Sequence, residues 1–303
     1  MGEAKRRKQL TANGGSSPVA GVGGWGLSNP STALELEEWF RKSGIDPSQP
    51  GIHDLPEFLR VEAQDPTALN MVARLVEARI YSAEELQQAE RKILVAAEAI
   101  AQHVAQDGRL GRCVVASSVL SKCLDELGVW NYTAKSSLTI RFPPAVSNRT
   151  QYFYTFDEGD FVAAHAVVVA PPFAVVDLTI RHQHYHKAGL AQRLPAMVCS
   201  KEFQPYRMQA QELVSPSVTA YLRSLGYPSA QAFLQRERPD MLRLMEQLPS
   251  REVTFEGSRL SYGIVAVGGY PERLSEIHSH NAMINGLTPL QIFENDILPK
   301  LSG

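Results

Sequence analysis

Residues 161–180 read FVAAHAVVVAPPFAVVDLTI, two apolar runs that meet at a pair of prolines. Runs of this kind, rich in valine and bounded by turn residues, predict two β-strands joined as an antiparallel hairpin. A turn centred on Pro171 places His165 directly opposite Asp177, because each lies six positions from that proline. A bulge at the two prolines would shift this register by one residue. The predicted strands are Phe161–Val169 and Phe173–Ile180.

His165 and Asp177 are polar side chains within these apolar strands. Residues opposite each other on an antiparallel pair project to the same face, with Cβ atoms roughly 4.5–5.5 Å apart. An unpaired polar side chain is costly in such surroundings. We therefore expect the carboxylate of Asp177 to bind and orient the imidazole of His165. A bond that serves only the stability of the core is the main structural alternative.

A helix is predicted upstream, in residues 108–128, which read GRLGRCVVASSVLSKCLDELG. Apolar side chains recur there at helical spacing, and Gly128 is typical of a residue that ends a helix. Cys113 lies in the first turn, where unpaired backbone N–H groups and the helix dipole favour negative charge. Arg109 and Arg112 add positive charge close by in the sequence. The apolar face comprises Cys113, Ala116, Leu120, Leu124 and Leu127.

Cys113 is placed to act as a nucleophile. A thiol attacks an acyl group as the thiolate, so a catalytic cysteine needs a helix N-terminus or an imidazole that lowers its pKa. With His165 and Asp177 it would complete a Cys-His-Asp triad, and the N–H groups of the helix would stabilise the oxyanion. Gln106, seven residues before the cysteine, is the nearest side-chain candidate for an additional oxyanion donor.

The triad resembles that of the transglutaminase-like branch of the papain-like cysteine enzyme superfamily. In that branch a cysteine at the start of a buried helix precedes a histidine on one strand and an aspartate on the next. The branch includes bacterial transglutaminase-like cysteine proteases and, more distantly, the arylamine N-acetyltransferases. The resemblance rests on GRCVVASSVLSKCLDELG, AAHAVVV and VVDLT, and covers about residues 108–180. It departs from the pattern at Ala166, where transglutaminase-type histidines are often followed by an aromatic residue, and RLGRC matches the acetyltransferase motif only loosely.

This resemblance implies an α+β fold with a papain-like core, in which an antiparallel sheet packs on the cysteine-bearing helix. It implies Cys113 as nucleophile, His165 as general base and then acid, and Asp177 as the orienting carboxylate. The expected function is a cysteine hydrolase, a peptidase or amidase, that works through an acyl-thioester and needs no cofactor. Two alternatives stay open. One is an acyltransferase of the transglutaminase or N-acetyltransferase type, and the other is a non-catalytic binding module that keeps the fold.

Alternating histidines follow the second strand of the hairpin. In RHQHYH, the imidazoles of His182, His184 and His186 would share one face of an extended chain, a spacing that can bind zinc or another transition metal. Lining of a substrate cleft and an exposed strand end are the other interpretations. The exposed strand end is favoured, because no carboxylate follows at ligand spacing. His278 and His280 fit a solvated loop.

Four segments divide the chain. Residues 1–30 form a basic, Gly- and Ser-rich arm that we expect to be flexible. Residues 31–107 form a helical region whose longest helix begins with a capping box at Ser82 and Glu85. Residues 108–200 carry the triad, and residues 201–303 form an α+β extension packed on that core. Further strands are predicted at 132–142, 151–156, 252–255 and 260–267, and further helices at 31–42, 66–78, 82–105, 215–248 and 288–298.

Composition excludes several classes of protein. The chain of 303 residues is 44% hydrophobic and has a formal net charge of -2, so no global charge would hold it on nucleic acid or an anionic membrane. It has no apolar run long enough to span a bilayer. Its three cysteines lack CxxC spacing, which argues against a disulfide framework or a thiolate zinc site.

The cysteine content and the N-terminal segment also predict a cellular compartment and possible partners. We interpret the other two cysteines as structural, because Cys123 falls on or beside the apolar face of the predicted helix and Cys199 has no histidine or carboxylate spaced to activate it. Few cysteines and no secretory apolar segment favour a cytoplasmic protein. We expect a peptide or a small acyl or amide compound as substrate, and the basic arm could contact a protein partner.

Overall fold

A computed structural model describes residues 25–158 and 165–302 of the chain. It contains helices and one antiparallel sheet, so the predicted α+β class is confirmed. Most of the predicted N-terminal arm lies outside the described residues, as do residues 161–164 of the predicted strand before His165.

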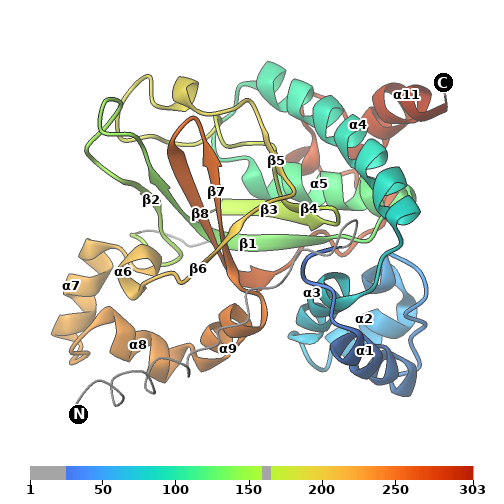
Figure 1. Cartoon of the computed structure of the whole chain (residues 1–303), viewed down its shortest axis with the longest axis horizontal. Helices are drawn as coiled ribbons and strands as arrows, with labels where there is room; N and C mark the ends of the chain where they lie inside the picture. Colours follow the sequence, from blue (N-terminus) through green and yellow to red (C-terminus); the bar gives the residue numbers. More distant parts are fainter. Residues whose placement is uncertain (1–24, 159–164, 303) are drawn as a thin grey trace, which may run out of the picture.

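A curled sheet of eight strands runs through the described part of the molecule (Figure 1). Its order is β5-β4-β3-β1-β8-β7-β6, and β2 also pairs with β1. Neighbouring strands are antiparallel throughout. The strands are β1 (Tyr132–Arg141), β2 (Gln151–Phe153), β3 (His165–Ala170), β4 (Phe173–Asp177), β5 (Val198–Ser200), β6 (Gln204–Tyr206), β7 (Ser250–Phe255) and β8 (Ser258–Val267).

β1 and β8 form the centre of this sheet. Leu138 of β1 lies opposite Tyr262 of β8, although the two residues are far apart in the sequence. The C-terminal segment 201–303 is therefore not only packed on the core, because it supplies β6, β7 and β8 to the sheet itself. Residues of the predicted catalytic segment and of the C-terminal segment meet as direct neighbours.

The predicted cysteine-bearing helix is α5 (Cys113–Glu126), and it packs on one face of the sheet. Leu120 and Leu124 belong to the same buried cluster as Val168 of β3 and Val176 of β4. α4 (Ala83–Asp107) packs against α5 and contributes to this cluster. It begins with the predicted capping box, in which the Ser82 hydroxyl accepts from the Glu85 N–H and the Glu85 carboxylate accepts from the Ser82 N–H.

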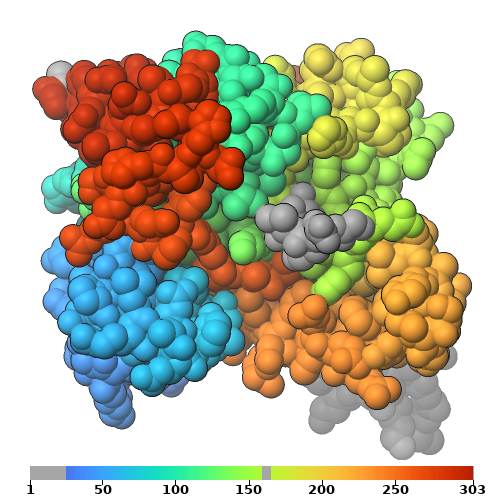
Figure 2. All heavy atoms as spheres, turned by 180° about the vertical axis from the view of Figure 1, so that it is seen from behind, coloured from blue at the N-terminus to red at the C-terminus, as the bar shows by residue number. Residues whose placement is uncertain are grey.

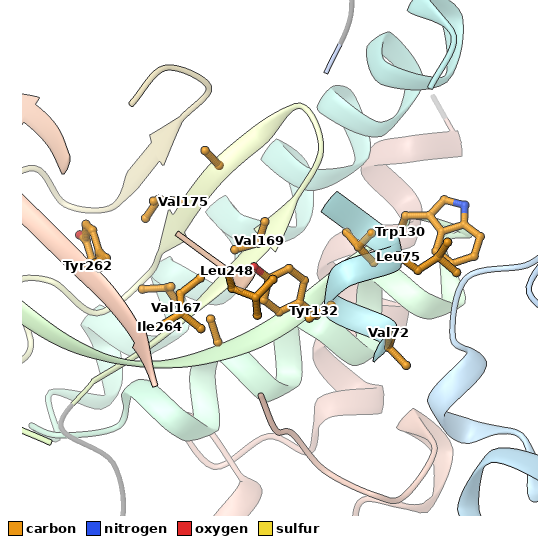
Figure 3. Packing of buried hydrophobic residues seen from close by; sticks show 14 of the residues in the cluster. Val72, Leu75, Trp130, Tyr132, Val167, Val169, Val175, Leu248, Tyr262 and Ile264 are labelled. Carbon is orange, nitrogen blue, oxygen red and sulfur yellow. The ribbon is translucent and has the colours of Figure 1, made fainter. Parts of the chain in front are cut away.

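A second buried cluster joins β1 to the N-terminal helices α1 (Pro30–Lys42), α2 (Pro56–Glu62) and α3 (Ala68–Ala78). Figure 3 shows Tyr132, Val167, Leu248 and Ile264 of this cluster gathered between the strands. The prediction that residues 31–42 form a helix is confirmed. The residue that caps it is Asn29, whose side-chain oxygen accepts from the Thr32 N–H.

The predicted helical stretch 215–248 is divided into three short helices. They are α7 (Pro216–Ser224), α8 (Ala230–Glu237) and α9 (Pro239–Gln247), preceded by α6 (Ala210–Leu213). Gly226 has a left-handed backbone and ends the first of the three, and Pro239 can only begin a helix because its ring removes an N–H donor. The stretch is helical as predicted, but its division into three helices was not predicted, because helical periodicity does not register such breaks.

The C-terminal helix begins as predicted at Thr288, whose hydroxyl accepts from the Gln291 N–H. It runs through α10 (Pro289–Ile292), a π-helical turn at Phe293–Ile297 and α11 (Leu298–Ser302). Seen from behind, the N-terminal helices (blue) and helices α6 to α9 (orange) form two separate masses, and the C-terminal segment (red) lies beside α4 (Figure 2). None of the helices within residues 25–158 and 165–302 is long and apolar enough to cross a membrane.

The register of the β3–β4 hairpin differs from the predicted one. Val168 lies opposite Val176 and Ala170 opposite Phe173, with an irregularity between the two pairs. This shift places Val167, and not His165, level with Asp177. The predicted direct pairing of His165 with Asp177 is therefore wrong, although both residues remain on the same face, because the register near Asp177 has moved by two residues.

Candidate active site

His165 and Asp177 meet in the interior of the protein. Nε2 of His165 lies 2.7 Å from Oδ2 of Asp177, and both side chains are 0% exposed. Because His165 lies two residues from the position opposite Asp177, the contact runs diagonally between β3 and β4. Diagonal neighbours on one face of a sheet are within reach of long side chains, and the imidazole spans the gap.

Two further residues hold the carboxylate of Asp177 in place. The Thr179 N–H donates to Oδ1 at 2.9 Å, and the Thr179 hydroxyl lies 3.4 Å from the same oxygen. The phenol of Tyr262, on β8, donates to Oδ2 at 3.1 Å. Each oxygen of Asp177 therefore has at least one hydrogen-bond donor, so the orientation of the buried carboxyl group is fixed.

Two aromatic rings pack close to the imidazole. The ring centroids of Phe153 and Tyr262 are each 6.2 Å from that of His165, with the planes tilted. Phe153 in turn packs edge-on against Tyr185 at 5.7 Å. This packing restricts rotation of the imidazole and fixes the direction in which its second nitrogen points.

That second nitrogen, Nδ1 of His165, is buried and makes no formed hydrogen bond with the described residues. The Cys113 thiol is close enough to act on the ring through its charge and its capacity to hydrogen-bond. Burial lowers the pKa of His165, but Asp177 and Cys113 outweigh it and raise this pKa to about 10. Nδ1 is thus the nitrogen free to accept a proton from the thiol.

Cys113 begins α5, as the sequence predicts, and is 3% exposed. One turn along the helix, the buried hydroxyl of Ser117 donates to the carbonyl oxygen of Ala166 at 2.9 Å. Ala166 directly follows His165 in β3. This bond fixes the first turns of the helix against the strand that carries the histidine, and so sets the thiol beside the imidazole.

Arg109 and Arg112 hold a C-terminal segment over the start of α5. Nη2 of Arg112 donates to the carbonyl oxygens of Asn281 and Met283, at 2.7 and 2.8 Å. Arg109 donates to the Met283 carbonyl at 2.9 Å and also binds the carboxylate of Asp107. The positive charge predicted near Cys113 is present, and the Arg112 guanidinium has carbonyl oxygens as partners in place of a carboxylate.

Gln106 lies on the exposed end of α4. Its side-chain oxygen accepts from the amide of Asn285 at 2.8 Å. The described contacts of Gln106 therefore do not favour the predicted oxyanion role. The backbone N–H groups in the first turn of α5, which have no partner within a helix, are better placed for it.

The predicted common face of the three histidines does not form, because residues 181–186 follow turns and bends where a strand was expected. The His182 carbonyl accepts from the Gly111 N–H at 2.9 Å, so this segment runs beside the start of α5. Nδ1 of His186 lies 2.6 Å from the side-chain oxygen of Gln151. His184 is exposed.

A different group of side chains lies close enough to share a metal ion. Among the described residues, ligand atoms of His53, Asp54 and Asp125 lie within 4.8 Å of one another. The ammonium group of Lys122 contacts Asp54, and Nε2 of His53 lies 3.2 Å from Asp125. Because both carboxylates already have cationic partners, we interpret this group as an ion-pair network that attaches residues 51–55 to α5.

The other two cysteines differ from Cys113 in their surroundings. Cys123 is 0% exposed, and burial together with Asp125 and Glu126 raises the pKa of its thiol. Burial and two carboxylates raise the pKa of Cys199 to about 12. Neither thiol has an imidazole as a partner among the described contacts, which fits the predicted structural role.

Tyr262 and Thr179 were not predicted as site residues. A signal for Tyr262 existed, since it is a tyrosine inside the apolar run of the predicted strand 260–267, where a buried phenol needs an acceptor. Its partner was not predictable, because the C-terminal segment was expected to pack on the sheet and not to form its centre. Comparison with known proteins finds no significant match of this chain to a family model, to a curated protein or to a solved structure.

Proposed function

We propose that this protein is a papain-like cysteine hydrolase, a peptidase or amidase, with Cys113 as its nucleophile. One observation carries the proposal: the imidazole of His165 is bound by Asp177 through Nε2, its Nδ1 has no hydrogen-bond partner among the described residues, and the Cys113 thiol is one of the groups that raise the pKa of the ring. A histidine that serves only the core would be expected to have partners on both ring nitrogens.

In this mechanism, Nδ1 of His165 takes the proton of Cys113 and the thiolate attacks the carbonyl carbon of the substrate. The oxyanion forms beside the N–H groups of the first turn of α5. The imidazolium then gives its proton to the leaving amine, which breaks the C–N bond and leaves an acyl-thioester. A water molecule, deprotonated by His165, hydrolyses the thioester and restores the thiol.

Asp177 supports both directions of this proton transfer. Its carboxylate keeps the Nε2 proton of the ring in place, which leaves the lone pair of Nδ1 available to the thiol. It also offsets the charge of the imidazolium. The raised pKa of His165 favours the protonated ring near neutral pH, the state in which an adjacent cysteine is most stable as a thiolate.

Alkylation with iodoacetamide tests the proposal without knowledge of the substrate. Near neutral pH, mass spectrometry of the full chain should find Cys113 labelled at least tenfold faster than Cys123 or Cys199, because only the thiolate reacts. His165→Gln should slow the labelling of Cys113, and the double variant Cys123→Ser, Cys199→Ser should leave it unchanged.

Equal and slow labelling of all three cysteines would contradict the proposal and favour a non-catalytic binding module. Substrates can then be sought with a peptide and acyl-donor screen in which Cys113→Ala is the control. Turnover that requires an added amine would identify an acyltransferase instead of a hydrolase.

A further inference from the structure

A cavity of about 200 Å³ lies at the end of α5 that is remote from Cys113. Its walls come from five segments of the chain: the loop after α1, the link between α3 and α4, the first half of α4, the residues that follow α5 and the turn between β3 and β4. A water molecule needs about 10–15 Å³ of cavity, so a small organic molecule has room here. The 14 residues of α5 span about 20 Å, so this cavity is separate from the candidate active site.

Trp130 supplies a hydrogen-bond donor to the cavity that it lines. The residue is 8% exposed, and its indole N–H has no hydrogen-bond partner among the described residues. Figure 3 shows the ring at the edge of the buried cluster, with its nitrogen on the side away from Tyr132. A buried indole N–H usually has a partner, so this one indicates a position that an acceptor on a ligand completes.

Two rings hold the guanidinium of Arg79 at the wall of the same cavity. Cζ of Arg79 lies 4.9 Å from the ring centroid of Tyr81 and 5.0 Å from that of Trp130. Within the described residues its one carboxylate partner is Glu85, which Nη1 contacts at 3.1 Å. A guanidinium has several N–H donors, so some remain beyond this contact. The rings restrict the guanidinium before any ligand binds, which lowers the entropic cost of binding.

Lys92 adds a cation that has no carboxylate partner. Its ammonium group donates to the carbonyl oxygen of Leu127 at 2.7 Å and forms no ion pair within the part of the chain that the structure describes. The side chain is half-buried and lines the cavity. Because an ammonium group is a triple donor, it can bind this carbonyl and still donate to a ligand.

The charged side chains of the cavity wall are positive in excess. Arg79 and Lys92 are its cations, and Glu85 is the one carboxylate among the described lining residues. Glu85 already accepts from Arg79 and from the Ser82 N–H. The wall therefore holds more donors than free acceptors, which favours an anion.

Carbonyl oxygens at the end of α5 do not cancel this charge. The N–H of Gly128 donates to the Asp125 carbonyl at 3.0 Å, and the N–H of Val129 donates to the Leu124 carbonyl at 2.9 Å. Lys92 binds a third carbonyl of the same helix end. The negative end of the helix dipole is thus largely satisfied by groups of the protein itself.

We propose that this cavity binds a small oxyanion, a phosphate or carboxylate group carried by a compact molecule. The ammonium group of Lys92, the guanidinium of Arg79 and the indole N–H of Trp130 donate to its oxygens. The remaining polar side chains of the wall can bind hydroxyl or amide groups of the same molecule, and they are Ser48, Gln49 and Gln88. This site does not depend on the proposed function, because none of its residues belongs to the triad.

Isothermal titration calorimetry of the full chain tests this proposal. Sodium phosphate and sodium succinate are titrated separately into the protein, in a Tris chloride buffer of constant ionic strength. We expect one site per chain, occupied at concentrations below about 10 mM. Binding of phosphate alone identifies a phosphorylated ligand, binding of succinate alone identifies a carboxylic acid, and binding of both supports the shared oxyanion chemistry. If neither binds, the proposal is wrong.

Two neighbouring glutamines of α4 provide a matched pair of variants. Both are exposed, but Gln88 lines the cavity and Gln87 does not. Gln88→Glu adds a negative charge to the wall and should weaken binding of the anion about tenfold. Gln87→Glu adds the same charge outside the cavity and should weaken binding less than about threefold.

Variants of the donors locate the anion within the cavity. Lys92→Met should weaken binding about tenfold or more, whereas Lys92→Arg should retain most of it because the charge remains. Trp130→Phe keeps an aromatic ring but removes the N–H, and should weaken binding about fivefold. Lys300→Met, at an exposed lysine of α11, is a further control and should change nothing.

Tryptophan fluorescence provides a second readout of the location. Trp130 is one of three tryptophans in the chain, so anion binding should change the emission of the wild type and not that of Trp130→Phe. Anion binding that Gln88→Glu, Lys92→Met and Trp130→Phe all leave unchanged would place the anion elsewhere and overturn the proposal. Equal losses in Gln87→Glu and Gln88→Glu would also overturn it, because they would reflect only the overall charge. Circular dichroism of each variant excludes loss of the fold as the cause.

Discussion

The phenol of Tyr262 donates a hydrogen bond to Oδ2 of Asp177, the oxygen that also binds His165. Tyr262 belongs to β8 and Asp177 to β4, two strands that are separated in the sheet by β3 and β1. The bond spans this distance because the sheet is curled and both side chains lie inside the curl. The C-terminal segment therefore takes part in holding the carboxylate.

We predict that Tyr262→Phe and Asp177→Asn have different effects on the labelling of Cys113 by iodoacetamide. Tyr262→Phe keeps the aromatic packing and leaves Thr179 as a donor to the carboxylate, so the labelling rate should stay within about threefold of the wild-type rate. The lost hydrogen bond should lower the free energy of unfolding by about 1–2 kcal/mol. Asp177→Asn removes the charge that stabilises the imidazolium, and the rate should fall about tenfold or more.

Both variants are to be compared by labelling kinetics and by urea unfolding. A loss of labelling in Tyr262→Phe as large as that in Asp177→Asn would mean that the phenol, and not Thr179, fixes the carboxylate.

The pH dependence of stability provides a second prediction. The pKa of His165 is raised from 6.5 to about 10, so the folded protein holds this proton more tightly than the unfolded chain does. The stabilisation is then complete below pH 6.5 and is lost as the pH rises through 10. We expect the free energy of unfolding, measured with urea, to decline over this range by several kcal/mol at most.

In Asp177→Asn the imidazolium loses its main counter-charge, so the decline of stability with pH should become much shallower. A wild-type protein whose stability is flat from neutral pH to pH 10 would show that His165 is neutral in the folded state.

Two adjacent serines on α5 give a third, paired prediction. Ser117 and Ser118 are both 1% exposed, but Ser117 donates to the Ala166 carbonyl and Ser118 has no partner among the described residues. Ser117→Ala should cost about 1–2 kcal/mol of stability. It should also slow the labelling of Cys113, because the helix is no longer fixed beside β3.

Ser118→Ala removes a buried hydroxyl that binds nothing in the described structure, so its stability should stay within about 0.5 kcal/mol of the wild type or increase. Thermal unfolding and iodoacetamide labelling, done side by side on the two variants, check this difference. Equal effects would show that the Ser117 bond does not position Cys113.

The sequence predicted which side chains share a face of the β3–β4 hairpin better than it predicted the register of the two strands. Alternation of apolar and polar residues has a period of two, so His165 and Asp177 could be assigned to one face of the hairpin from the sequence alone. Alignment depends on the turn, and the irregularity between Val168 and Ala170 moves it by two residues. Because the shift is an even number, the contact survives in a diagonal form.

Long-range strand order was beyond what the sequence could provide. Local periodicity predicts that β7 and β8 form a hairpin, but it does not say that β8 pairs with β1 at the centre of the sheet. For this reason the contact of Tyr262 with Asp177 was missed, whereas the helix start at Cys113 was found from local signals alone. The order of strands in a sheet depends on how the complete faces of the sheet are buried. No short sequence motif encodes this order.

A buried ion pair between Arg251 and Glu77 lies beside Tyr262. Arg251 of β7 is directly opposite Tyr262 in the ladder, and its guanidinium contacts the carboxylate of Glu77 on α3. The Tyr132 phenol donates to the same carboxylate at 2.5 Å, and Arg251 also donates to the Ala174 carbonyl at 2.6 Å. The side chain of Arg251 is 1% exposed and that of Glu77 is 8% exposed, so neither charge can find water if its partner is removed.

We predict that Arg251→Met alone destabilises the protein by about 3–5 kcal/mol, because it leaves the Glu77 carboxylate buried without a cation. The double variant Glu77→Gln, Arg251→Met should be less destabilised than the sum of the single variants by more than about 1 kcal/mol, since it removes both charges. Urea unfolding of the four proteins measures this coupling, and additive effects would contradict the ion pair. Because Arg251 adjoins Tyr262, Arg251→Met should also slow iodoacetamide labelling of Cys113, whereas Lys300→Met should not. The network thus connects the N-terminal helix α3 to the strand pair that carries Tyr262, the residue that donates to Asp177.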